Sequence, residues 1–308
     1  MIPLLLALAA VQAAPAAAPS APASPVEIAA SAPRAEWVAI APEDLLVMTL
    51  APDARGKPRQ VVIQLMPAPF SQGWVANIRT LAKARWWDGM SVNRVQDNYV
   101  AQWGDPNGED AAKAKKLPGG LKTMSESAYD TPEPTAGLAS DMQLLANGRD
   151  AYAPSVGFTR GFPGGQDGTK RWPIHCYGSV GVGRNLSPDT GSGAELYAVI
   201  GHAPRHLDRN IAVVGRVVEG IEHLSSLPRG TEALGFYATA AERTPIASIR
   251  LASDMPAGER PRFEYLSTEG ASFARYAEAR ANRKDAFFIR PAGGADVCNV
   301  PVPVRRVP

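Results

Sequence analysis

A succession of short apolar runs separated by turn-forming residues is the feature that most constrains the fold of this chain. Such runs cover residues 45–50, 60–66, 91–95, 98–103, 178–183, 195–200, 211–217 and 245–251. Their length and their content of β-branched residues are typical of strands. Because short strands dominate, the pattern favours an antiparallel barrel or sandwich over a parallel α/β sheet.

Helical periodicity is clear in only a few places. Over residues 70–87, Phe70, Trp74 and Ile78 recur at helical spacing and predict an amphipathic helix that packs on the sheet. A second, shorter helix is expected at residues 218–226. The strand-rich part of the chain should therefore carry two helices at most, and another helix is expected later, at residues 268–284.

The first residues have the pattern of an export signal. Residues 4–11 form a short apolar run without a basic residue ahead of it, and Val11-Gln12-Ala13 fits a signal-peptidase site. We therefore expect residues 1–13 to be a signal peptide and the protein to be periplasmic. The run is far shorter than the roughly 20 apolar residues that span a bilayer, so no membrane-spanning segment is expected.

The rest of the chain divides by composition. Residues 14–36 are rich in Ala and Pro and predict an extended linker, which is followed by a folded domain at 37–252 and a C-terminal extension at 253–308. Residues 109–175 are rich in Gly and Pro and too long for a plain connection, which indicates a long loop insertion. We favour packing of this insertion on the domain over a role as a substrate-selecting lid.

The composition excludes some functions. Hydrophobic residues make up 45% of the chain and charged residues 20%, as in soluble globular proteins. The formal net charge is only +2 and the basic residues are scattered, so a nucleic-acid partner is not expected.

No common catalytic or cofactor motif is convincing. His202 and His206 have the spacing of two metal ligands on a helix, but Pro204 lies between them and predicts a loop, so we expect no metal site. The glycines of residues 178–183 come close to a dinucleotide-binding loop, but the third comes one residue early and no helix follows. We therefore expect no cofactor.

The two cysteines, Cys176 and Cys298, lie far apart in the sequence. In an oxidising compartment they could form one disulfide that closes a long loop. Two unpaired thiols are the alternative, and the sequence does not choose between them.

Two blocks of the sequence resemble the cyclophilins. Residues 92–95 (Val-Asn-Arg-Val) and 99–105 (Tyr-Val-Ala-Gln-Trp-Gly-Asp) are similar to the Phe-His-Arg and Phe-Met-x-Gln-Gly-Gly-Asp signatures of that family, in order and spacing. After the insertion, residues 178–197 and 207–217 resemble its second half. The resemblance implies a closed antiparallel β-barrel capped by two helices, with the insertion and the C-terminal extension added to it.

The resemblance also implies peptidyl-prolyl cis-trans isomerase activity. Rotation about an X-Pro bond meets a barrier of about 18–20 kcal/mol because amide resonance is lost, yet no bond is made or cut. The reaction needs no nucleophile, metal or cofactor. It needs an apolar pocket for the proline ring and a donor that stabilises the twisted amide.

The site residues follow from the matched positions. Arg94 falls on the catalytic arginine of the family, although by itself it would read as a surface arginine at a strand end. Gln102 falls on the glutamine that orients the arginine or the substrate. The remaining implied substrate-binding residues are Tyr99, Val100, Gly183, Glu195, Tyr197 and Leu207, most of which would line the proline pocket.

Three departures bear on activity. Asn93 and Ile211 replace family histidines, and Glu195 replaces a glutamine. If Glu195 lies close to Arg94, an ion pair could hold the guanidinium or could compete with the substrate for its donors. We therefore expect weak or selective catalysis.

The implied partners are proline-containing segments of exported proteins, bound by a monomer that assists their folding. Two alternatives remain open from the sequence. One is an inactive module of the same fold that binds proline-containing peptides, and the other is an envelope protein in which the barrel is only a scaffold.

Overall fold

The centre of the molecule is a closed antiparallel barrel. The computed structural model describes residues 22–133, 142–146, 148, 150–285 and 287–307, so the expected signal peptide lies outside the described residues. The strands follow the order β11-β12-β5-β4-β14-β2-β3-β13, and pairing of β13 with β11 closes the barrel. They are β2 (Leu45–Leu50), β3 (Arg59–Leu65), β4 (Ser91–Val95), β5 (Val100–Gly104), β11 (Ser179–Val182), β12 (Leu196–Val199), β13 (Val213–Glu219) and β14 (Thr244–Leu251). The predicted fold class is confirmed, and each predicted strand run corresponds to one barrel strand.

Strand β2 shows why the barrel strands are so apolar. Leu46, Met48 and Leu50 point into the barrel core, whereas Leu45 and Val47 belong to a second apolar cluster outside it. Successive side chains of a strand alternate between its faces, so both faces of β2 are covered. The second cluster is therefore a layer of structure built on the outside of the barrel.

Two helices pack on the barrel and are shorter than the sequence suggests. Helix α2 (Gln72–Lys83) buries Trp74, whose indole N–H donates to the carbonyl oxygens of Thr190 and Gly191 at 3.0 Å. It ends well before residue 87 because Arg85 adopts a φ of 53°, a left-handed conformation that a helix cannot continue through.

The other barrel helix, α3 (Glu222–Ser225), is also a correction to the predicted range of 218–226. Strand β13 runs on to Glu219, and Gly220 then turns the chain with a φ of 84°. The residues expected to open the helix are therefore still strand.

The insertion is more regular than the predicted long loop. Its described part carries β6 (Thr131–Pro132), β7 (Gln143–Leu144), β8 (Ser155–Thr159), β9 (Phe162–Gln166) and β10 (Lys170–Pro173), which form a sheet of order β6-β10-β9-β8-β7. Arg160 and Gly161 both have positive φ and join β8 to β9 in a tight hairpin. Phe158 of this hairpin packs edge-on against Phe273 of the C-terminal extension, so the insertion and the extension share one apolar cluster.

Segments that precede and follow the barrel in the sequence pair in a separate three-stranded sheet. Strand β1 (Trp37–Ala39) pairs with β15 (Phe263–Leu266), which pairs with β16 (Val304–Arg306). We call these three strands the terminal sheet. Residue 37, where the folded domain was expected to begin, thus opens a strand that pairs with the C-terminal extension, not with the barrel.

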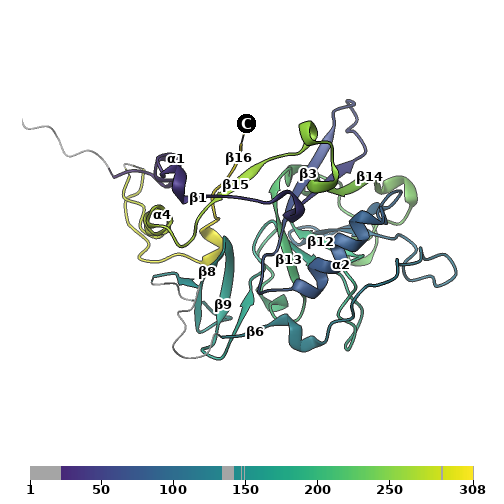
Figure 1. The fold of residues 1–308 in the computed structure, drawn as a ribbon, viewed down its shortest axis with the longest axis horizontal. Helices are drawn as coiled ribbons and strands as arrows, with labels where there is room; N and C mark the ends of the chain where they lie inside the picture. Colours follow the sequence, from purple (N-terminus) through teal and green to yellow (C-terminus); the bar gives the residue numbers. More distant parts are fainter. Residues whose placement is uncertain (1–21, 134–141, 147, 149, 286, 308) are drawn as a thin grey trace, which may run out of the picture.

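The expected extended linker is also partly helical. Within its described part, α1 (Pro25–Ala30) packs on α4 (Ala271–Ala281), and Figure 1 shows the two side by side at the end of the molecule away from α2. The Ser24 hydroxyl accepts from the Glu27 N–H at 3.3 Å, while the Ser24 N–H donates to the Glu27 carboxylate at 2.7 Å. This capping box explains how so short a helix can begin in an Ala/Pro-rich stretch.

The two cysteines form a disulfide. Cys176 follows the insertion and Cys298 lies in a 3₁₀ turn of the C-terminal extension, with a Cα–Cα distance of 5.2 Å and a sequence separation of 122. The bond ties the extension to the start of β11. Among the described residues, no helix is long and apolar enough to cross a membrane.

Candidate active site

Arg94 lies on β4 with its guanidinium held by three oxygen atoms. Nε donates to the carbonyl oxygen of Leu234 at 2.7 Å, and Nη1 donates to Oε1 of Gln102 at 3.1 Å. Nη2 donates to the side-chain oxygen of Gln96. These bonds use three of the five N–H groups of the guanidinium and fix its orientation, and the remaining N–H groups are available to a ligand.

Aromatic rings flank the same guanidinium. Its central carbon lies 5.6 Å from the ring centre of Tyr99 and 5.4 Å from that of Phe236, distances at which a cation is attracted to a ring face. Partial burial lowers the pKa of Arg94 from its ordinary value. The group remains a cation at neutral pH because arginine starts from so high a pKa.

Strand pairing brings Gln102 to this arginine. Gln102 on β5 is the register partner of Arg94 on β4 and of Tyr197 on β12. Three of the residues singled out from the sequence therefore lie across three neighbouring strands. Adjacent cross-strand positions place side chains within contact distance, which explains the short link from Gln102 to the guanidinium.

Glu195 lies on the other side of Gln102. Its Oε1 accepts from the Asp105 N–H at 2.7 Å, and its carboxylate is also hydrogen-bonded by the side chain of Gln102. Among the described residues, Arg94 and Glu195 form no direct ion pair. Glu195 therefore neither holds the guanidinium directly nor competes with a substrate for its donors. Gln102 instead accepts from the arginine and donates to the carboxylate.

Gly183 makes room for this arrangement. A Cβ atom at Gly183 would lie 2.9 Å from Cβ of Glu195 and 3.4 Å from Nε2 of Gln102. All three residues line a cleft of about 490 Å³. The structure therefore brings together the polar residues that the resemblance singled out.

An apolar cluster lies next to Arg94, whose guanidinium carbon lies over the ring of Tyr99. The cluster is separate from the barrel core, and its members are Tyr99, Val100, Tyr197, Val199, Leu207 and Ile211. The four residues predicted to line a proline pocket are all among them. Ile211, which stands where the family has a histidine, adds an apolar side chain to this cluster.

Asn93, which also stands where the family has a histidine, has a structural role. Its side chain is buried, with Nδ2 donating to the carbonyl oxygen of Gly104 at 3.1 Å and Oδ1 accepting from the Ser91 hydroxyl at 2.6 Å. These bonds tie β4 to the end of β5. Asn93 thus supports the strand that carries Arg94.

A buried polar network holds the hydroxyl of Tyr197, a member of the apolar cluster. The hydroxyl of Tyr197 lies 2.9 Å from Nε2 of His175, and Nδ1 of His175 lies 2.9 Å from Oδ1 of Asp208. A carboxylate can only accept, so Nδ1 carries the proton and, in the neutral ring, Nε2 accepts from the tyrosine. Burial raises the pKa of Tyr197 well above its usual value, so the phenol keeps its proton.

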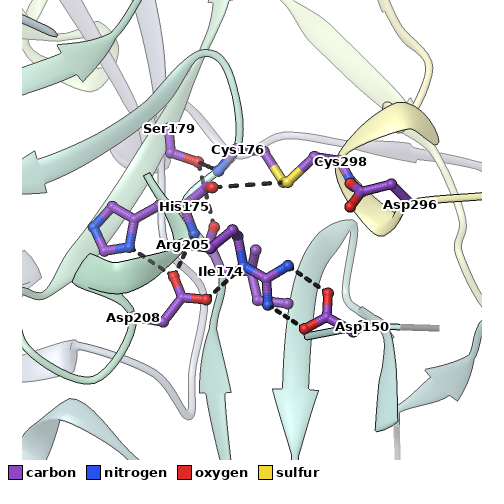
Figure 2. The surroundings of a disulfide bond; sticks show 9 residues. All are labelled: Asp150, Ile174, His175, Cys176, Ser179, Arg205, Asp208, Asp296 and Cys298. Atoms are coloured by element: carbon purple, nitrogen blue, oxygen red, sulfur yellow. Dashed lines mark hydrogen bonds and ion pairs between the residues drawn. A yellow bond between two sulfur atoms is a disulfide. The ribbon is translucent and has the colours of Figure 1, made fainter. Parts of the chain in front are cut away.

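The network continues into the insertion. Arg205 donates from Nε to Asp208 at 2.6 Å and from its two terminal nitrogens to Asp150. Figure 2 shows Arg205 between the two carboxylates, with the disulfide close by. Sequence reasoning did not single out His175, Arg205 or Asp150, because they come from separate segments and their spacing carries no motif. Asp208 directly follows the matched Leu207, which was the one available signal.

Glu195 should make stability depend on pH. Burial raises the pKa of its carboxyl from 4.5 to about 7, against the hydrogen bonds from Asp105 and Gln102. The folded protein then holds a proton that the unfolded chain releases near pH 4.5, so stability contributed by Glu195 is complete below that pH and is lost as pH rises to about 7. The loss is on the order of 3 kcal/mol.

Urea unfolding of the wild type and of Glu195→Gln at pH 5 and pH 8 checks this. The variant keeps an amide oxygen that can accept from the Asp105 N–H but has no proton to release. We expect it to gain stability relative to the wild type at pH 8 and not at pH 5. An equal difference between the two proteins at both pH values would contradict the prediction.

Comparisons with known proteins agree with this geometry. Residues 59–251 match the family model described as cyclophilin type peptidyl-prolyl cis-trans isomerase/CLD. The matched range contains all eight barrel strands except β2, together with the insertion and each residue of the Arg94 site. No curated protein matches the chain.

Solved structures match over most of the chain. The cyclophilin AquaCyp293 from Hirschia baltica is 20% identical, with a TM-score of 0.66 over 88% of this chain and 93% of the other. A cyclophilin type peptidyl-prolyl cis-trans isomerase from Cryptosporidium parvum, solved in the presence of the dipeptide Ala-Pro, is 10% identical, with a TM-score of 0.38 over 67% and 97%. At such identities, the first similarity shows a shared fold.

Proposed function

The chain belongs to the cyclophilin-type peptidyl-prolyl cis-trans isomerases, and we propose that it is an exported member acting as a monomer on extended proline-containing segments of other exported proteins. The placement of Arg94 beside the apolar cluster supports the isomerase activity most strongly. A fixed cation and an apolar surface for the proline ring are the two elements that rotation of an X-Pro bond requires.

The mechanism follows from this placement. The proline ring rests on the apolar cluster, and its nitrogen gains a lone pair as the amide twists and resonance is lost. An N–H of Arg94 donates to that nitrogen, which stabilises the twisted amide more than the planar one. Gln102 and the carbonyl oxygen of Leu234 hold the guanidinium in place beforehand, so little reorganisation is needed during the reaction.

Two observations support export. The apolar run at residues 4–11 is followed by a fitting cleavage site, and the disulfide between Cys176 and Cys298 suits an oxidising compartment. Fusion of residues 1–36 to a phosphatase that is active only outside the bacterial cytoplasm tests the proposal. We expect an active fusion and an inactive one when residues 1–13 are removed. An inactive but intact full fusion would overturn export.

Assistance to folding is tested on an exported client protein whose refolding is limited by a slow prolyl phase. We expect catalytic amounts of this protein to accelerate that phase, because its rate is set by X-Pro rotation. Arg94→Ala serves as the matched inactive protein. Acceleration by both proteins alike would point to binding of the client without isomerisation.

A further inference from the structure

A second cleft, of about 740 Å³, opens beside the Arg94 site and, among the described residues, shares only Tyr99 with it. We call it the side cleft. One wall comes from the barrel loops and includes Tyr99 and His206, and the other comes from the insertion and the C-terminal extension and includes Tyr152 and Asp296. Its size falls within the range of about 300–1,000 Å³ that is usual for ligand pockets.

The side cleft adjoins the Arg94 site through Tyr99. This residue belongs to the apolar cluster, lies under the guanidinium of Arg94 and also lines the side cleft. His206 stacks on Tyr99 with a distance of 6.4 Å between ring centres. These two stacked rings therefore lie between the Arg94 site and the cleft.

The walls are fixed without a ligand. Arg205, almost fully buried, joins Asp208 of the barrel side to Asp150 of the insertion, and the disulfide fixes Cys298 against the barrel, as Figure 2 shows. A preformed cleft loses little conformational freedom when it binds, which favours affinity. The insertion and the extension thus hold an open surface next to the active site.

The lining indicates the chemistry of the ligand. Two tyrosines that line it, Tyr152 and Tyr177, are about half exposed at 54% and 53%. Asn98 and Asn299 add amide groups that can bond a peptide backbone. The side-chain surface is therefore polar and aromatic, as in surfaces that bind peptides.

The charge of the lining further restricts the class of ligand that the side cleft can bind. Its two aspartates and one arginine give a formal charge of −1 with neutral histidines, and the charge of Arg205 is already compensated by Asp150 and Asp208. Phosphate groups and acidic segments would meet net repulsion, whereas neutral or basic segments would not.

We propose that the side cleft binds a neutral or basic extended segment of the client chain that adjoins the isomerised X-Pro bond. The inference rests on the proposed function, since it assigns part of the same client to this surface. Four extended residues span about 13 Å, which sets the length of the test peptides.

The test compares a tetrapeptide with a central Ala-Pro bond and the same peptide extended by four neutral polar residues on one side or on the other. Exchange rates measured by NMR give kcat/KM for each. We expect one of the two extensions to raise kcat/KM about five- to tenfold through a lower KM, because the added contacts act equally in the ground and transition states. Acidic residues in that extension should cancel the gain.

Ala151→Trp provides the blocking variant. Ala151 is exposed and lines the side cleft, so a bulky ring there fills the cleft without disturbing a packed core. We expect it to abolish the gain from extension and to leave turnover of the tetrapeptide within about twofold. Ala257→Trp, at an exposed alanine in the 3₁₀ turn Ala257–Glu259, is the matched control and should keep the gain.

The outcomes separate this proposal from the isomerase function. Turnover of the tetrapeptide with no gain from either extension, or a gain that survives Ala151→Trp, would overturn the side cleft alone. If no peptide is turned over, binding of the extended peptides is measured by calorimetry. Absent turnover with binding that Ala151→Trp removes would overturn the isomerase activity and support the cleft, and absent binding would overturn both.

Discussion

Arg94→Ala is expected to reduce kcat/KM for X-Pro isomerisation by about 10²–10³-fold, the usual effect of removing one preorganised donor from a transition state. Arg94 is partly exposed and its ring contacts with Tyr99 and Phe236 lie at the surface of the barrel. The barrel should therefore stay folded. NMR exchange in an Ala-Pro peptide, with urea unfolding of both proteins alongside, measures the effect.

Arg94→Lys is the informative companion variant. Lysine keeps the positive charge but replaces the planar set of donors with a flexible ammonium group, so it cannot bond Gln102, Gln96 and the Leu234 carbonyl together. Arg94→Lys should therefore show most of the loss of kcat/KM expected for Arg94→Ala. Turnover of Arg94→Ala equal to that of the wild type would remove this residue from the mechanism, and absent turnover by the wild type with peptide binding retained would mean a proline-segment binder.

Arg205→Met is expected to lower the free energy of unfolding by about 3–5 kcal/mol, the range found when one partner of a buried ion pair is removed. The side chains of Asp150 and Asp208 are nearly inaccessible, at 2% and 5% exposure, and Arg205 is their shared cation. Methionine fills much of the arginine volume but leaves two buried carboxylates without a counter-charge. Urea unfolding at neutral pH measures the loss.

Two control variants show whether charge is the cause. Arg79→Met removes an arginine whose ion pair with Asp44 is about one-third exposed, and it should cost less than about 1 kcal/mol. Adding Asp150→Asn to Arg205→Met removes one of the uncompensated charges and should recover part of the loss. An unchanged loss in that double variant would place the effect in packing and not in electrostatics.

The barrel was predictable because its strands carry local signals. Each strand is a short apolar run bounded by turn residues, and the alternation seen in β2 is the direct result of covering both of its faces. Helix α2 was predictable for the same reason, with Trp74 and Ile78 repeating at helical spacing. The ends of α2 and α3 were not, because Arg85 and Gly220 change the chain direction through left-handed conformations that apolar periodicity does not report.

The sheet of the insertion was not predicted because its strands contain glycines, which are uncommon within strands. Gly157 lies in β8, and Gly164 and Gly165 lie in β9. A Cβ at Gly157 would lie 2.4 Å from the carbonyl oxygen of Gln143 on the neighbouring strand. The glycines therefore allow close backbone contact, a reason that only the paired structure reveals.

The residues of the active site also fall into those that the sequence predicted and those that it did not. Arg94 and Gln102 were predictable because they sit in one local motif on two adjacent strands. The network behind Tyr197 was not, since His175 and Asp208 lie 33 residues apart in sequence and Arg205 reaches Asp150 across 55. Pairings of this kind depend on the folded chain, and single-sequence spacing carries no record of them.

The terminal sheet has a consequence for how the molecule comes apart. Strand β1 precedes the barrel, β15 and β16 follow it, and the guanidinium of Arg305 lies 3.8 Å from the ring centre of Trp37. Strand β1 can leave only by breaking its pairing with β15, and the loss of either end of the chain exposes part of the apolar cluster that covers β2. The chain should therefore unfold as one cooperative unit, and a fragment cut at residues 37 and 252 would lose the part of this covering layer that the C-terminal extension supplies.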